Sequence, residues 1–159
     1  MKSLSAMLIM VTTITLATTV PSVSPAQATD VTDANATVLH RQKVMETVGA
    51  LMDTLGCVTK KECTLDDKAV TKNARGIAFM AELSLPAFRG KAEGATVKHT
   101  AKPEIWSEWA KFEGGLKAMG DAATRVATLA VEAKREQALE AIGELGKTCK
   151  GCHDTFRTK

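Results

Sequence analysis

A short run near the C-terminus, Cys149-Lys150-Gly151-Cys152-His153, brings together two thiols and an imidazole. On a helix, Cys152 and His153 lie three and four residues after Cys149, so the three side chains project from one side. Cys-x-x-Cys-His is the sequence at which haem c is attached through two thioethers, with the histidine as an axial ligand of the iron. The run therefore predicts one covalent haem c on Cys149 and Cys152, with His153 as the proximal ligand.

Two other hypotheses explain the same thiols, namely a redox-active pair and half of a zinc site. A thioredoxin-like pair is expected near a β-α-β pattern, which the sequence lacks. A structural zinc site needs four ligands, often from a second cluster of Cys or His. We therefore expect haem, and a thiol-disulfide oxidoreductase is the less favoured hypothesis.

Four segments of the chain have apolar residues at helical spacing, which predicts amphipathic helices. These segments cover residues 33–55, 65–83, 103–130 and 134–156, and a long loop is expected over residues 85–102. Four such helices in one domain indicate an all-α fold, an antiparallel up-down-up-down four-helix bundle. The two cysteines fall on the core-facing side of the last helix, so the haem is expected in the bundle core.

The composition agrees with a core that is partly filled by something other than protein. The chain of 159 residues is 45% hydrophobic, yet aromatic residues make up 4% and Tyr is absent. A length near 150 suggests a single domain. The net charge of +3, with both signs interspersed, supplies no basic run that would track phosphates, so nucleic acid is not an expected partner.

The N-terminus has the pattern of a secretory signal peptide. A cationic start is followed by an apolar stretch and by Ala26-Gln27-Ala28, a small-x-small cleavage site. We predict cleavage after Ala28, which removes residues 1–28 and leaves residues 29–159 as the exported domain. An uncleaved membrane anchor is the alternative, but the stretch is rich in Thr, and no membrane association is expected after cleavage.

Export exposes the remaining cysteines to an oxidising compartment. Cys57 and Cys63 bracket five residues between the first two predicted helices, which favours a disulfide that closes this small loop. Free thiols and a metal site are the alternatives.

Arg41 lies on the face of the first predicted helix that otherwise carries apolar residues. A guanidinium on a buried face is unfavourable unless it is paired. The alternative is that Arg41 lies at the edge of this face and extends to water.

Three groups of residues, taken in this order behind an export sequence, resemble the cytochrome c-prime family of class II c-type cytochromes. The groups are Arg41-Gln42-x-x-Met45, Ala101-Lys102-Pro103-Glu104-Ile105-Trp106 and Cys149-Lys150-Gly151-Cys152-His153-Asp154-x-Phe156-Arg157. The resemblance covers the whole mature chain. It implies a four-helix bundle with one haem c near the C-terminus, located in the periplasm, and a homodimer built through the first two helices.

The resemblance also implies roles for further residues. Arg41, Gln42 and Thr100 would lie near the haem propionates, and a propionate is a suitable bidentate partner for the buried guanidinium. Arg157 would stand beside the proximal imidazole. Met45 would lie over the distal face of the iron.

Met45 leaves two functions open, neither of them enzymatic. A coordinating thioether makes a low-spin carrier of single electrons, with redox proteins of the periplasm as partners. A side chain that does not coordinate leaves a five-coordinate iron that binds small neutral gases such as nitric oxide or carbon monoxide. We expect electron transfer, with gas binding as the alternative.

Overall fold

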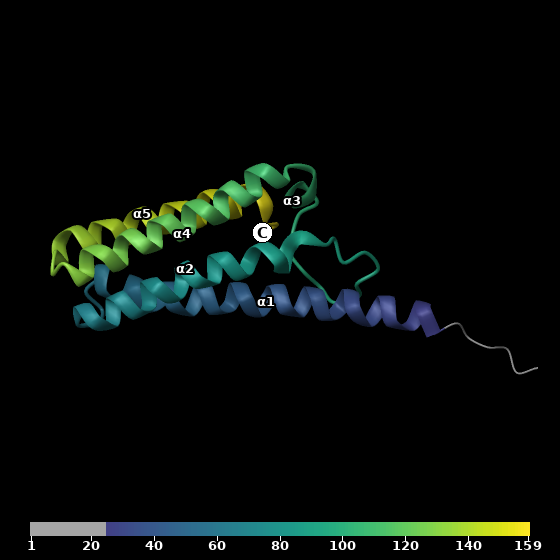
Figure 1. Ribbon diagram of the computed structural model, residues 1–159, viewed down its shortest axis with the longest axis horizontal. Helices are drawn as coiled ribbons and strands as arrows, with labels where there is room; N and C mark the ends of the chain where they lie inside the picture. The colour runs from purple at the N-terminus through teal and green to yellow at the C-terminus, as the bar shows by residue number, and fades with distance from the viewer. Residues whose placement is uncertain (1–24) are drawn as a thin grey trace, which may run out of the picture.

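The computed structural model in Figure 1 describes residues 25–159, with side chains from Asp33 onward. Within this range the chain forms five helices. They are α1 (Pro25–Thr59), α2 (Asp67–Arg89), α3 (Glu104–Ser107), α4 (Trp109–Val131) and α5 (Arg135–Phe156).

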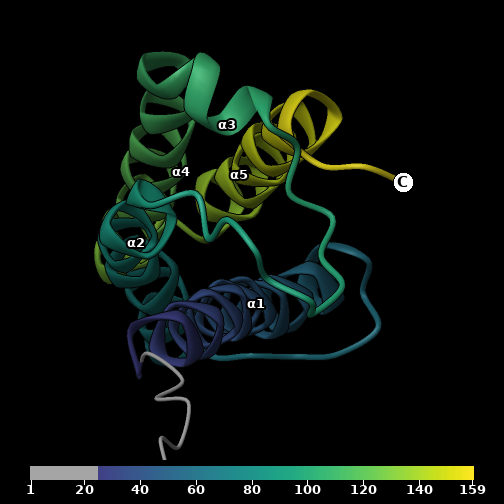
Figure 2. The same cartoon turned by 90° about the vertical axis from the view of Figure 1, so that its right-hand side faces the viewer.

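The four long helices form two antiparallel pairs, α1 with α2 and α4 with α5 (Figures 1 and 2). The pairs are joined mainly through α2 and α4, whereas α1 and α5 make the least extensive contact of the four neighbouring pairs. The two pairs diverge towards the end that carries α3 (Figure 1). The expected all-α four-helix bundle is therefore confirmed, and it is most open between α1 and α5.

The bundle core follows the predicted helical periodicity. Ile77 of α2, Ala123 and Val126 of α4, and Leu145 of α5 are fully buried. The α2–α4 contact is close because α4 has a glycine there: a Cβ added at Gly120 would lie 3.3 Å from the Cβ of Ala81. Small residues at this crossing bring the two helix pairs together.

The predicted boundaries of three helices are wrong. The first helix, expected over residues 33–55, extends beyond both ends, from Pro25 to Thr59. The loop expected from residue 85 begins later, because α2 continues through the exposed Pro86 to Arg89. The third predicted helix is interrupted at Glu108, whose φ of −116° and ψ of 41° separate α3 from α4.

The predicted signal peptide, residues 1–28, lies outside the described residues except for its last four, which form the start of α1. The predicted cleavage after Ala28 falls within this first turn. Among the described residues, no helix combines the length and the apolar character needed to cross a membrane.

Candidate functional site

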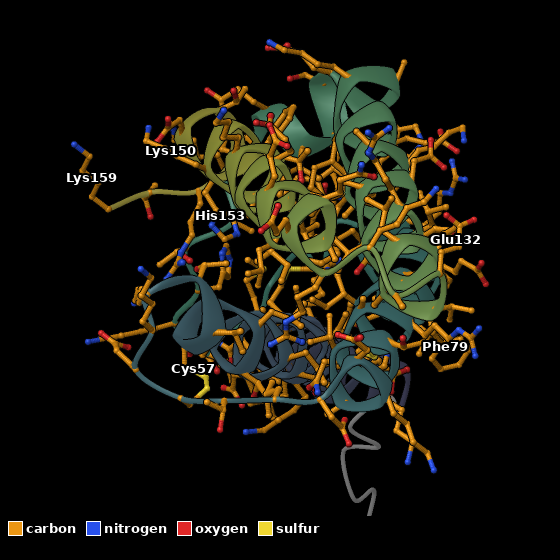
Figure 3. The ribbon with its side chains drawn as sticks, turned by 90° about the vertical axis from the view of Figure 1, so that its left-hand side faces the viewer. Cys57, Phe79, Glu132, Lys150, His153 and Lys159 are labelled. Atoms are coloured by element: carbon orange, nitrogen blue, oxygen red, sulfur yellow. A yellow bond between two sulfur atoms is a disulfide. The ribbon has the colours of Figure 1, made fainter. Side chains whose placement is uncertain are left out.

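The last two turns of α5 carry Cys149, Cys152 and His153. Both cysteines are partly buried and neither forms a disulfide. His153 lies on the side of α5 that faces α1 (Figure 3). The helix ends directly after these residues, because Arg157 turns to an extended conformation while its N–H still donates to the carbonyl of His153 at 3.0 Å. The structure thus places two free thiols and an imidazole together at the open end of the bundle.

Two glycines lie close to this part of α5. Gly115 faces it from α4, and Gly146 lies one turn earlier on α5 itself. A Cβ at Gly115 of α4 would lie 3.5 Å from Sγ of Cys152, and a Cβ at Gly146 of α5 would lie 3.8 Å from Cε of Met52 on α1. Because these two positions have no side chain, α4 can lie close to Cys152 and the side chain of Met52 can reach α5. Together with a donor set of two thiols and an imidazole, this arrangement fits a covalently attached haem.

The pKa shifts of Cys149, Cys152 and His153 agree with haem attachment better than with a redox-active thiol pair. Burial raises the pKa of the Cys149 thiol, and burial followed by the proximity of Cys149 raises the pKa of Cys152. Reactive redox pairs instead have a thiol of lowered pKa. Burial, and then the charge of Arg157, lower the pKa of His153, which favours the neutral imidazole that can bind a metal.

Arg41 is buried, at 4% exposure, so the alternative that it extends to water is wrong. Its Nε donates to the carbonyl of Ala87 at 2.8 Å, and its Nη2 donates to the carbonyl of Gly90. The guanidinium also lies 5.2 Å from the ring centre of Trp106 and 5.4 Å from that of Phe88. These contacts tie α1 to the C-terminal end of α2 and to α3, and they give the buried charge its partners.

Aromatic side chains gather beside Arg41 and reach the end of α5. Phe112 lies at the centre, with ring centres 5.2 Å from Phe88, 5.7 Å from Trp109 and 5.3 Å from Phe156. Trp106 joins this cluster to the backbone, since its Nε1 donates to the carbonyls of Phe88 and Gly90. Five of the six aromatic residues of the chain, all except Phe79, are thus concentrated at the end of the bundle that carries the thiols.

The structure places the other predicted propionate neighbours along the connection between α2 and α3. Gln42 donates from Nε2 to the carbonyl of Lys98 at 2.9 Å. Thr100 accepts a hydrogen bond from Nε of Arg157 at 3.3 Å, and its carbonyl accepts from the N–H of Thr158 at 2.8 Å. Thr100 and Arg157 are therefore brought together, and Gln42 lies at the same connection on the α1 side.

Met45 lies on α1, partly buried and packed against the core. It is four residues after Arg41, whose contacts set the position of this part of the helix. Met45 and His153 are thus carried by α1 and α5, which make the least extensive contact of the four neighbouring pairs of long helices.

Two further residues, to which the sequence assigned no role, hold the connection. Asn35 of α1 accepts from the N–H groups of Thr96 and Val97 through one side-chain oxygen, at 2.8 and 3.1 Å. Lys102 donates from Nζ to the carbonyl of Thr155 at 3.2 Å, near the end of α5. Asn35 is seven residues before Gln42, which is the only indication in the sequence that both lie on one helical face.

Cys57 and Cys63 are joined in the structure across the turn between α1 and α2, with Cα atoms 5.4 Å apart. This disulfide lies outside the proposed haem site, whose nearest residue in the sequence is Met45, 12 residues before Cys57. The described residues contain no cluster of three or more His, Cys, Asp or Glu side chains that could hold a metal ion.

Comparison with known proteins gives one consistent result. The sequence model of a family described as Cytochrome C' matches residues 36–157. A protein named Cytochrome c' from Pararhodospirillum photometricum is 34% identical over 122 residues, which cover 77% of this chain and 96% of the relative. A Cytochrome c-556 from Rhodopseudomonas palustris is 30% identical over 122 residues, or 74% of this chain and 80% of the relative.

A solved structure with the same fold is the nitric oxide complex of a mutant of cytochrome c prime from Alcaligenes xylosoxidans. It has a TM-score of 0.69 and 26% identity, and the match covers 79% of this chain and 97% of that chain.

Proposed function

Because this chain belongs to the cytochrome c′ family, we propose that it is a periplasmic carrier of single electrons with one haem c on Cys149 and Cys152. Proteins of this family are haem proteins that transfer electrons or bind gases. The observation that supports the covalent site is the pair of free, partly buried thiols beside His153, opposite a glycine of α4.

In this proposal each residue of the site has a defined task. Bound haem supplies an iron that accepts or donates one electron. Cys149 and Cys152 hold the group against α5, and His153 binds the iron from the proximal side. Arg157 helps to keep the imidazole neutral, because its charge lowers the pKa of His153 in addition to burial.

The propionates would be bound at the connection between α2 and α3. Arg41 already uses Nε and Nη2 for backbone carbonyls, which leaves Nη1 for a carboxylate. Gln42 and Thr100 line the same connection. The backbone contacts of Arg41 would hold its guanidinium in place before a propionate arrives.

The mass of the exported protein tests the covalent site. We expect the mature chain to exceed its sequence mass by one haem after denaturation, with no reactive thiol at Cys149 or Cys152. An unmodified chain with two titratable thiols there would contradict the proposal and favour the thiol-disulfide hypothesis. Reduction followed by alkylation should release two thiols from the disulfide that we propose between Cys57 and Cys63.

A substitution at Met45 separates electron transfer with methionine ligation from gas binding. If Met45 is a ligand, Met45→Leu should convert the reduced protein from low spin, with sharp visible bands, to high spin. This exchange keeps the side-chain volume nearly constant, so it tests the sulfur and not the packing. Met52→Leu, two turns further along α1, is the matched control and should leave the spectrum unchanged.

The second candidate function is binding of nitric oxide or carbon monoxide at a five-coordinate iron. It is favoured by the structural relative described as a nitric oxide complex of cytochrome c prime. If Met45→Leu leaves a high-spin spectrum unchanged, methionine ligation is excluded and gas binding becomes the better assignment.

The resemblance to the family also leads us to propose a homodimer through α1 and α2. Sedimentation velocity at micromolar concentration should then give the mass of two chains, and a monomer would contradict this assembly.

A further inference from the structure

The positive charge of this chain is concentrated in two segments that lie far apart in sequence. Residues 89–102 and 147–159 together carry eight Lys and Arg against two acidic residues, a net charge of +6. The whole chain carries only +3, so all other residues together carry −3. The charge distribution is therefore polarised, although the total charge is small.

The fold brings these two segments together. The N–H of Lys102 donates to the carbonyl of Phe156 at 3.0 Å, and the N–H of Thr158 donates to the carbonyl of Thr100 at 2.8 Å. An isolated antiparallel bridge pairs Ala101 with Arg157. The basic side chains of both segments thus surround the end of α5 that carries His153. We define six of the eight as the basic face: Lys98, Lys102, Lys147, Lys150, Arg157 and Lys159.

Figure 3 shows the orientation of this surface. Lys150, His153 and Lys159 lie on one side of the molecule, whereas Phe79 and Glu132 lie on the opposite side. Phe79 is 58% exposed, so a large exposed apolar side chain lies away from the basic face.

Much of the charge on the basic face is not neutralised within the molecule. Lys147 and Lys150 pair with Glu144 and Asp154 on their own helix. In the part of the chain that the structure describes, the other four members of the face have no carboxylate within 4 Å. These four positive charges exceed the two negative charges that the proposed haem propionates would bring to the connection, and the excess is available to a partner.

We propose that the basic face is the docking surface for a redox protein whose own docking surface is acidic; this inference rests on the proposed electron-transfer function. A positively charged surface next to the proposed haem raises the rate of encounter with a negatively charged partner. It also orients the partner before electron transfer. Such complexes need only a small interface, which suits the limited area around His153.

The composition of the face favours a protein over the other anionic surfaces. Membrane binding would require apolar side chains to enter the interface beside the cations. Of the four exposed large apolar residues among the described ones, Phe79 lies on the opposite side of the molecule and Leu83 and Val131 belong to α2 and to the last residue of α4. The fourth, Leu39 of α1, is a single side chain and does not make an apolar patch. The carboxylates of Glu144 and Asp154 would also repel a phosphate backbone, while they can pair with the cations of a protein surface.

A nuclear magnetic resonance titration of the haem-loaded chain tests the surface without using its electron transfer. Poly-L-glutamate at low ionic strength should shift amides of residues 96–102 and 147–159, and about 0.5 M NaCl should abolish the shifts. Shifts centred elsewhere, or none, would overturn the proposal. Tighter binding of phosphatidylglycerol vesicles or of oligothymidylate at the same ionic strength would assign the face to a membrane or a nucleic acid instead.

Electron exchange with small oxidants tests the functional part. One electron passes from the reduced protein to hexacyanoferrate(III), which becomes hexacyanoferrate(II). At low ionic strength, Lys98→Glu with Lys159→Glu should slow this reaction roughly tenfold and accelerate reduction of a tricationic cobalt(III) complex. The matched control, Lys68→Glu with Lys72→Glu on α2, makes the same charge change away from the face and should alter both rates less than about twofold.

The two experiments distinguish a failure of the proposed electron-transfer function from a failure of the proposed docking surface. A haem-loaded chain that exchanges electrons with neither oxidant would refute the proposed function, while the titration of the same chain still reports on the surface. A haem-loaded chain whose rates respond equally to both pairs of substitutions would refute the docking surface alone.

Discussion

Arg41 shows how one buried residue can fix the position of a helix. Its guanidinium is held by the carbonyls of Ala87 and Gly90 and lies between the rings of Phe88 and Trp106. The sequence indicates that this arginine needs a partner, because it falls among apolar positions. The sequence cannot identify the partners as backbone carbonyls, because every residue has a carbonyl group. Only the folded structure shows that those of Ala87 and Gly90 lie within reach.

We expect Arg41→Lys to lower the free energy of unfolding by about 1–3 kcal/mol. Lysine keeps the charge but cannot donate from two fixed positions, so at least one buried carbonyl loses its donor. Urea unfolding of the haem-loaded protein measures the change. Arg125→Lys on the exposed side of α4 is the control and should stay within about 0.5 kcal/mol; an equal effect of the two substitutions would show that the buried contacts are not what stabilises the bundle.

At the scale of elements, the periodicity of apolar residues predicts the four long helices but not where three of them begin and end. The spacing of Ile105, Trp109 and Phe112 continues unchanged through the break at Glu108, so the pattern contains no sign of it. The break is accompanied by tertiary contacts, notably the hydrogen bonds from Trp106 to the end of α2. Pro86 has no N–H to donate within α2, but its position on the exposed side lets the helix continue.

The connection between α2 and α3 is predicted to depend on Asn35. We expect Asn35→Ala to increase amide hydrogen exchange at Thr96 and Val97, because both N–H groups lose the oxygen that accepts from them. The accompanying loss of stability should be about 1 kcal/mol. Exchange measured by mass spectrometry or nuclear magnetic resonance gives the result residue by residue.

Asn73→Ala provides the matched control for this element. The side chain of Asn73 donates to the carbonyl of Ala69 within its own helix. Its removal should leave exchange at residues 96–97 unchanged. If the amides of Thr96 and Val97 stay protected in the Asn35→Ala variant, the contacts of residues 100–102 with the end of α5 are sufficient to hold the connection.

At the scale of the whole molecule, the close α2–α4 contact and the looser α1–α5 contact have different tasks. The first holds the two helix pairs together, and the second leaves room for the proposed haem. Gly120→Leu should destabilise the bundle by about 1–3 kcal/mol, because a side chain at this position meets Ala81. Thermal or urea unfolding measures the difference.

Gly114→Ala in the same helix should have the opposite sign. Apart from its chain neighbours and the backbone of its own helix, no heavy atom of the described residues lies within 4 Å of an added Cβ at this position. The substitution should therefore stabilise α4 by up to about 1 kcal/mol through lower backbone entropy in the unfolded chain. If both substitutions destabilise, the effect at Gly120 cannot be attributed to the helix crossing.

The backbone pairing of residues 100–102 with residues 156–158 also matters for anyone who purifies this protein. A peptide tag fused after Lys159 would begin two residues beyond Thr158, whose N–H is paired with the carbonyl of Thr100. A polyhistidine tag would place extra imidazoles beside His153 and amid the cations of the basic face. Tags at this end should therefore be removable, and binding or spectral data should be collected only after their removal.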